Sequence, residues 1–261
     1  MKSKKLKKWT TLLTCATALT VMTACSQSSS QATGTTSSAT SKTSSVTATT
    51  SKKTNKNNSN YFTSKDSDTS YNESSATKIK LSGSSADVSG DGAALSGSTI
   101  TISKAGTYVI SGKSDGVQIK VDAGDSDDVH IVLDGVTMTN TNAAINATKA
   151  GHVYLTLKDG TTSTLSDSSS NSDEDADAVI FSKGDLTING SGTLNIDAKK
   201  NNGIKANDSL HMTGGTYKIT SVGDAFNVND ELNITGTTMT IEAEEDAVKV
   251  DNDDDTSAGT M

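Results

Sequence analysis

The chain has 261 residues, a formal net charge of −8 and no arginine, so all 23 of its basic residues are lysines. An acidic chain without arginine is a poor candidate for binding nucleic acid, which requires neutralisation of phosphates. The two cysteines are Cys15 and Cys25, which leaves the rest of the chain without a disulfide, a cysteine nucleophile or a thiolate metal site.

The first 24 residues have the pattern of an export signal. Lysines cluster before residue 9, and the apolar stretch that follows is broken by threonines and is too short for a good membrane span. Small residues then precede Cys25, as in a bacterial lipoprotein signal. We expect residues 1–24 to be a lipoprotein signal peptide and Cys25 to carry the lipid, with a plain secretory signal as the alternative. The lipid would then be the only membrane contact of the chain.

Residues 25–75 are rich in serine and threonine and contain almost no aliphatic side chains. Such a composition cannot bury enough apolar surface to offset the entropy of ordering. We therefore expect a disordered linker that lifts the following domain away from the membrane.

From residue 76 onward, short segments alternate apolar and polar side chains, as strands with one buried face do. In the C-terminal third this pattern repeats about every 22 residues, with three segments in each repeat. Leu186, Leu210 and Leu232 begin one series of equivalent segments. Three strands per repeat at constant length predict an all-β solenoid over residues 76–261, with coils about 4.8 Å apart.

Equivalent positions of successive coils form columns, and one of these columns is acidic. It contains Asp177, Asn202, Asp224 and Asp246. Two carboxylates one coil apart repel by roughly 3 kcal/mol at an effective dielectric of 20. Exposure to solvent, interleaved amides or a shared cation would relieve this repulsion. The alternative to a cation site is that these residues only make turns.

Calcium suits a site of this kind because it takes carboxylate, amide and carbonyl oxygens in flexible geometry. The residues that we expect to bind it are Asp224 and Asp246 with Glu244 and Glu245, and, as a second candidate, Asp177 with Asp175.

Three segments carry a family resemblance: residues 102–112 (ISKAGTYVISG), 131–136 (IVLDGV) and 186–194 (LTINGSGTL). Together with the Asp-Ala-aliphatic repeats, they resemble a family of carbohydrate-binding domains of bacterial surface proteins. The resemblance implies a right-handed parallel β-helix of pectate-lyase-like shape, bound calcium, and binding of cellulose or acidic polysaccharide. Such domains usually continue through further coils, so we expect an uncapped last coil and a C-terminally truncated domain.

An enzyme of this shape would be a polysaccharide lyase, which needs a base to remove the C5 proton of a uronate. With no arginine present, Lys205 and Lys249 are the candidates, because both occupy the outward middle position of a strand and Asn227 lies between them in the same column. Outward lysines on an acidic face are equally explained by solvation. His130, His152 and His211 lack the spacing of metal ligands, and we expect them at the solvated surface.

A binder of crystalline cellulose usually presents tryptophan, and the single Trp of this chain lies in the signal. This favours a calcium-bridged grip on an acidic polysaccharide, with cellulose as the other candidate ligand. The sequence therefore predicts a monomeric, non-catalytic carbohydrate-binding β-helix, lipid-anchored on the extracellular face of a bacterial membrane. A lyase and a structural or adhesion stalk are the alternatives.

Overall fold

A computed structural model describes residues 44–49, 61–252 and 259–261. The expected signal peptide and the lipidation site Cys25 lie outside the described residues. Those residues are all-β apart from one 3-10 helix, η2 (Lys65–Ser67). No helix in this part of the chain has the length and apolar character needed to span a membrane.

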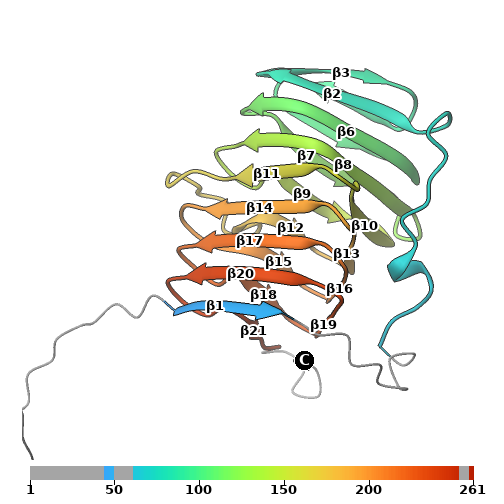
Figure 1. Cartoon of the computed structure of the whole chain (residues 1–261). Helices are drawn as coiled ribbons and strands as arrows, with labels where there is room; N and C mark the ends of the chain where they lie inside the picture. The colour runs from blue at the N-terminus through green and yellow to red at the C-terminus, as the bar shows by residue number, and fades with distance from the viewer. Residues whose placement is uncertain (1–43, 50–60, 253–258) are drawn as a thin grey trace, which may run out of the picture. The chain divides into compact units, whose positions relative to one another are not determined.

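The strands lie in three rows that stack along one axis (Figure 1). One row contains β11 (Thr162–Ser166), β14 (Thr193–Ala198), β17 (Thr216–Ser221) and β20 (Thr238–Ala243). A second row contains β10 (His152–Leu157), β13 (Leu186–Gly190), β16 (Ser209–Thr213) and β19 (Glu231–Thr235). The long strand β8 (Asp128–Thr139) pairs with both β10 and β11 and so joins the two rows in one sheet, to which β6 (Gly106–Asp115) adds.

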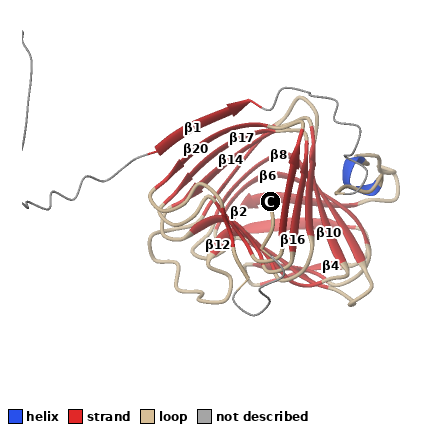
Figure 2. Cartoon of the chain, turned by 90° about the horizontal axis from the view of Figure 1, so that it is seen from below, coloured by secondary structure: helices blue, strands red, loops and turns tan. Residues whose placement is uncertain are grey.

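The third row forms a separate sheet. It contains β5 (Thr99–Ile102), β7 (Gln118–Asp122), β9 (Ile145–Lys149), β12 (Ala178–Ser182), β15 (Asn202–Ala206), β18 (Phe226–Val228) and β21 (Lys249–Val250). Each turn of the chain contributes one strand to each row, and neighbouring coils pair in parallel. Seen along the stack in Figure 2, the rows enclose a common interior. The chain is therefore a parallel β-solenoid, as the repeats predicted.

The interior is filled by the apolar positions that the alternation predicted. Leu186, Leu210 and Leu232 pair in register and are at most 2% exposed. Leu194 pairs with Tyr217 in the same way. Stacking equivalent side chains one coil apart gives one continuous core, which no single coil could bury alone.

The predicted register is wrong by one residue at β12. The column that aligned Asp177 with Asn202 places Val179 opposite Ile204, but Ile180 is the residue that pairs with Ile204. Val179 and Ile180 are both buried in the main core, whereas Phe181 faces outward, in register with Lys205, and packs in a separate apolar cluster. The loop that precedes β12 accommodates this shift of one residue, and Ala176 of the loop packs against Phe181.

Antiparallel strands cover the first coil of the solenoid. The strand β2 (Thr77–Gly83) pairs with β3 (Ser85–Ser89), and β4 (Ala93–Ser96) pairs with β5. At the other end of the stack we expected an uncapped coil. There β1 (Ser44–Thr49) pairs antiparallel with β20, and Thr260 forms a bridge to Glu231 of β19. The described edges of β19 and β20 are therefore paired.

The ordered structure begins earlier than residue 76. Residues 61–75, which we assigned to the linker, run along the outward side of the second row and are called the strap below. Asp66 of the strap is 2% exposed. Tyr71 packs against Val109 and Val132, two aliphatic side chains on the outward face of the sheet. Residues 61–75 are therefore part of the ordered structure and not of a disordered linker.

Candidate functional site

The outward side of the third row carries the predicted lysine column. Lys205 of β15 pairs in register with Asn227 of β18, which pairs with Lys249 of β21. The intervening positions point inward, and Ile204 and Phe226 have no exposed surface. Because coils are about 4.8 Å apart, the two lysines lie on one row with an amide between them. We call this surface of β15, β18 and β21 the lysine face.

The two lysines have different surroundings. Lys205 Nζ lies 2.7 Å from Asp177 Oδ1, and both side chains are partly buried. Lys249 is exposed and forms no ion pair among the described residues. The structure therefore engages Lys205 with Asp177 and leaves Lys249 available to solvent.

The acidic column next to the lysine face is a ladder of hydrogen bonds. Asn202 Oδ1 accepts the amide of Asp224 at 2.9 Å, and Asp224 Oδ1 accepts the amide of Asp246 at 3.0 Å. Asn202 Nδ2 donates to Asp177 Oδ2 at 3.3 Å. The other oxygen of Asp224 accepts a hydrogen bond from Asn227 Nδ2 at 2.7 Å. These hydrogen bonds thus connect each turn to the equivalent turn of the next coil.

This ladder uses the atoms that we expected to hold calcium. Asp224 is 4% exposed and both of its carboxylate oxygens accept hydrogen bonds within the protein. The other expected ligands, Glu244, Glu245, Asp246 and Asp175, are exposed, and Asp177 is engaged by Lys205. Across the described residues, no three histidine, cysteine or acidic side chains form a group that could hold a metal ion. The residues of the column therefore fit a turn ladder and do not form a ready calcium cage.

The loop between β11 and β12 forms a wall beside the lysine face. Residues 169, 170, 172, 174 and 175 of this loop are exposed, whereas Asp167 and Asn171 have no exposed surface. Asp167 accepts hydrogen bonds from the amide of Lys199 at 2.6 Å and from Asn171 Nδ2 at 3.0 Å. Burial raises the pKa of Asp167 in spite of these bonds. The loop is therefore fixed to the turn that precedes β15.

Two open hollows lie beside the ladder. One, of about 370 Å³, is lined by residues 171–174, Asp177, Lys200 and Asn201. The other, of about 430 Å³, is lined by residues 197–199, 220–222 and 242–244. The second hollow crosses three coils and combines the carboxylates of Asp197, Glu242 and Glu244 with the exposed side chain of Val222.

The histidines are not at a solvated surface, contrary to expectation. His130 of β8, His152 of β10 and His211 of β16 lie on the outward side of the second row, beneath the strap, and β13 separates β10 from β16. Burial lowers the pKa of His130 and of His152. Tyr154 faces outward but is only 9% exposed, because Lys65 of the strap lies 4.8 Å above its ring.

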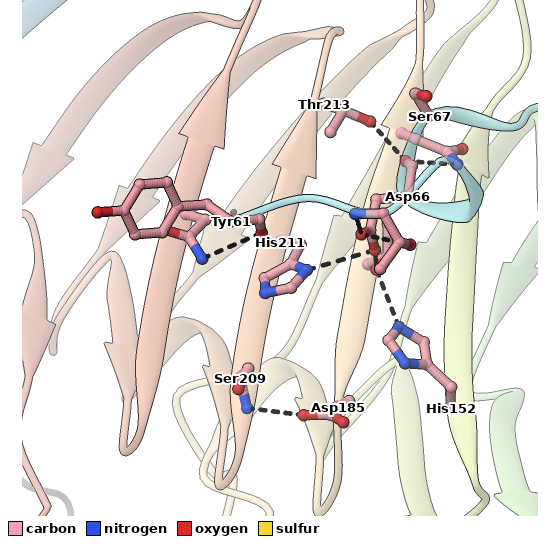
Figure 3. Close-up of polar contacts among 12 residues, drawn as sticks. Tyr61, Asp66, Ser67, His152, Asp185, Ser209, His211 and Thr213 are labelled. Carbon is pink, nitrogen blue, oxygen red and sulfur yellow. Dashed lines mark hydrogen bonds and ion pairs between the residues drawn. The ribbon is translucent and has the colours of Figure 1, made fainter. Parts of the chain in front are cut away.

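Asp66 joins the strap to two strands, β13 and β16 (Figure 3). Its Oδ1 accepts a hydrogen bond from Thr187 Oγ1 at 2.7 Å and lies 3.3 Å from His211 Nδ1. Its backbone carbonyl accepts hydrogen bonds from Asn189 Nδ2 at 3.2 Å and Thr213 Oγ1 at 2.6 Å. Burial alone would raise the pKa of Asp66, but the hydrogen bonds from Thr187 and Thr63 outweigh it and hold this pKa below its usual value. The aromatic residues at 61, 62 and 71, in an otherwise polar stretch, were the available signal for the strap.

The chain is similar to known proteins in sequence and in fold. The model of a family described as carbohydrate-binding domain-containing protein matches residues 96–261. The chain belongs to this family of carbohydrate-binding domain-containing proteins. A protein of the same description from Acetivibrio thermocellus is 38% identical to it over 135 residues, which are 49% of this chain and 47% of that protein. This member of the family thus spans about half the length of the curated relative it matches.

A solved structure shares the fold of this carbohydrate-binding domain-containing protein. It is the polysaccharide lyase-like protein from C. thermocellum, in a gadolinium derivative. The likeness has a TM-score of 0.56 and 25% sequence identity, and it covers 66% of this chain and 93% of that one. The all-β stack of parallel strands is consistent with the β-helix of such proteins.

Proposed function

We propose that this chain is a non-catalytic module that binds acidic polysaccharide along the lysine face. The observation that carries the proposal is the row formed by Lys205, Asn227 and Lys249, in a family of carbohydrate-binding domains. A polymer that lies along the solenoid axis meets one member of this row per coil. Ammonium and amide groups donate hydrogen bonds to the carboxylates and hydroxyls of a uronate chain.

Cellulose is the less favoured ligand. Flat aromatic surface is the usual means of holding an uncharged sugar sheet, since it combines apolar area with a polar edge. Among the described residues, the large apolar side chains that are exposed are Tyr61, Val222 and Met261, and these do not form a platform. A charged ligand is therefore better matched to this surface than a neutral one.

Calcium dependence stays a prediction within this proposal. The exposed carboxylates of Glu244, Glu245 and Asp246 could share a calcium ion with the carboxylate of a bound uronate, which would supply ligands that the protein alone lacks. Export and a lipid at Cys25 would hold the module, as a monomer, on the outer face of a bacterial membrane.

The test is retention of the chain lacking residues 1–25 on insoluble polygalacturonate and on cellulose, with calcium and with chelator. Lys249→Ala should weaken retention on polygalacturonate about two- to five-fold, the value of an exposed ionic contact. The matched control is Lys218→Ala, which removes an exposed lysine from β17 in a different row. Equal retention of the two variants would refute the lysine face, and no retention on either polymer would favour a structural stalk.

A lyase is the second candidate, because Lys249 is exposed and forms no ion pair with any residue that the structure describes, and the structural relative is called polysaccharide lyase-like. Release of unsaturated uronate from polygalacturonate, lost in Lys249→Ala, would establish it. Retention without any unsaturated product would leave the non-catalytic binder.

A further inference from the structure

The outward surface of β10, β13, β16 and β19 that the strap covers is rich in hydrogen-bond donors. We call this surface the strap face. Thr187, His211 and Asn233 occupy one register position on three adjacent strands. Asn189 and Thr213 occupy the position two residues further along. Thr187, Asn189, Thr213 and Asn233 all donate hydrogen bonds to oxygens of the strap.

The direction of these bonds is fixed by two relays within the face. Thr187 Oγ1 gives its hydrogen to Asp66, so it accepts from His152 Nε2, which lies 2.9 Å away. Thr156 Oγ1 donates to Asn189 Oδ1 at 2.6 Å, which leaves Asn189 Nδ2 to donate to carbonyls of the strap. The face is therefore arranged to donate outward, and the strap supplies the acceptors.

An aromatic surface adjoins the donors. The ring of His152 is stacked on that of Tyr154, with centroids 4.1 Å apart and planes at 16°. The strap places the ammonium of Lys65 over the Tyr154 ring, and this ammonium is also paired with Asp128. Aromatic rings beside fixed donors are a combination that binds the faces and the oxygens of sugar rings.

We propose that the strap face is a second binding site, for the carboxylate and ring oxygens of an acidic sugar, which Asp66 occupies as an internal ligand. The carboxylate of a uronate would take the place of the Asp66 carboxylate against Thr187 and His211. Its hydroxyls would take the hydrogen bonds that Asn189 and Thr213 now give to the strap backbone. This site is separate from the lysine face, and the proposal rests on the proposed function in its choice of an acidic sugar.

Strap and sugar then compete for one surface. When only a fraction of the molecules is in the state that can bind, the apparent affinity equals the intrinsic affinity multiplied by that fraction. Weakening the strap should therefore strengthen the binding of the sugar, whereas loss of an ordinary structural clamp should leave binding unchanged or weaken it. This opposite sign distinguishes the two roles of the strap.

The experiment measures the affinity of a short, soluble galacturonate oligomer by calorimetry, in the chain lacking residues 1–25. Asp66→Ala should raise the affinity about ten-fold or more, and Asp68→Ala should not change it. Asp68 is the matched control because, among the described residues, its side chain accepts hydrogen bonds from Ser70 alone, which also belongs to the strap. A neutral glucose oligomer should bind no better after either substitution.

Lys65→Ala provides a second test of the proposal in case the Asp66→Ala chain does not fold. It removes the contacts with Asp128 and Tyr154 from an exposed position, and it should raise the affinity a few-fold. In the wild-type chain, the oligomer should accelerate hydrogen exchange of the amides in residues 61–75. Each measurement is repeated with Lys249→Ala, which removes the lysine-face contact but should leave the gain from Asp66→Ala intact.

Three outcomes would overturn the proposal. They are an unchanged or lower affinity in folded Asp66→Ala and Lys65→Ala chains, slower exchange in the strap when the oligomer binds, and a gain that disappears in the Lys249→Ala background. Failure of the proposed lysine face would be recognised separately. In that case the wild-type chain is retained on polygalacturonate and Lys249→Ala does not reduce this retention.

Discussion

Thr187 donates a hydrogen bond to Asp66 at 2.7 Å, although the two residues are 121 positions apart. The bond fixes a segment that precedes the first coil of the solenoid to a strand in its middle. Asp66 is almost fully buried there, so the strap is a constituent of the fold. Removing the carboxylate would leave the donors Thr187 and Thr63 without their acceptor.

We predict that the domain loses stability on mild acidification. Burial holds the pKa of His130 and of His152 below the usual value of about 6.5, whereas both histidines regain that value on unfolding. The unfolded chain then binds more protons, so stability present above about pH 6.5 is lost as the pH falls through the folded values. Asp66 adds a second loss below about pH 4, since its pKa is also lowered in the folded state.

The measurement is the melting temperature between pH 8 and pH 4. His152→Gln keeps a side-chain N–H donor but does not titrate, and it should flatten the profile between pH 7 and pH 5. The charged groups around the histidines are Lys65, Asp68, Asp128, Asp185 and Asp66. A melting temperature that is constant from pH 7 to pH 5 in the wild-type chain would show that burial of the histidines does not control stability.

Asp224→Ala should destabilise the domain by about 1–3 kcal/mol, because it leaves the amide of Asp246 without an acceptor. Asp224→Asn retains an acceptor oxygen and should cost less. Asp246→Ala changes an exposed side chain and should stay within about 0.5 kcal/mol of the wild type. Chemical denaturation of the three variants checks this order, and equal losses for Asp224→Ala and Asp246→Ala would contradict the ladder.

Chelation of calcium should leave the melting temperature unchanged and lower retention on polygalacturonate. The described carboxylates form no metal-holding group by themselves, so calcium would act mainly where the sugar completes its coordination. Thermal melts and retention assays with and without chelator separate the two effects. A melting temperature several degrees lower in chelator would instead indicate a resident ion that stabilises the folded chain by mass action.

Gly190→Ala should destabilise the solenoid much more than Gly236→Ala. Both glycines have positive φ, +101° and +66°, and a side chain costs roughly 1–2 kcal/mol in that region. A Cβ at Gly190 would lie 2.2 Å from the carbonyl oxygen of Leu157 in the neighbouring coil, whereas at Gly236 the nearest atom is 3.7 Å away. Melting temperatures of the two variants test this, and equal losses would show that the coils can separate at this turn.

The regular coils could be predicted from the sequence because one physical rule governs them. Alternating side chains and a constant repeat length place Leu186, Leu210 and Leu232 in one stacked column, and the structure has that register. The same rule placed Lys205, Asn227 and Lys249 in one row. It failed at β12, where the loop before the strand changes the repeat length and turns Phe181 outward.

The strap could not be predicted by the same reasoning. The contacts of Asp66 are polar and their partners on the strands are more than a hundred positions away. The composition of the strap itself resembles that of a linker. The outward aliphatic residues Val109 and Val132 indicated that something covers this side of the sheet, but not which segment does so. Asp66 is buried among side chains from separate strands that donate hydrogen bonds to it. No local sequence pattern predicts that these residues come together.

The placement of the strap also constrains the order in which the chain can fold. Tyr61 O accepts a hydrogen bond from Asn233, which is synthesised 172 positions later. A nascent chain must therefore carry an undocked N-terminal segment until nearly all coils exist, because contacts of such long range are reached only after the loop between them has closed. During that interval His152, Tyr154 and Thr187 face solvent, and the assembling coils offer this polar surface to whatever else is present in the compartment where folding takes place.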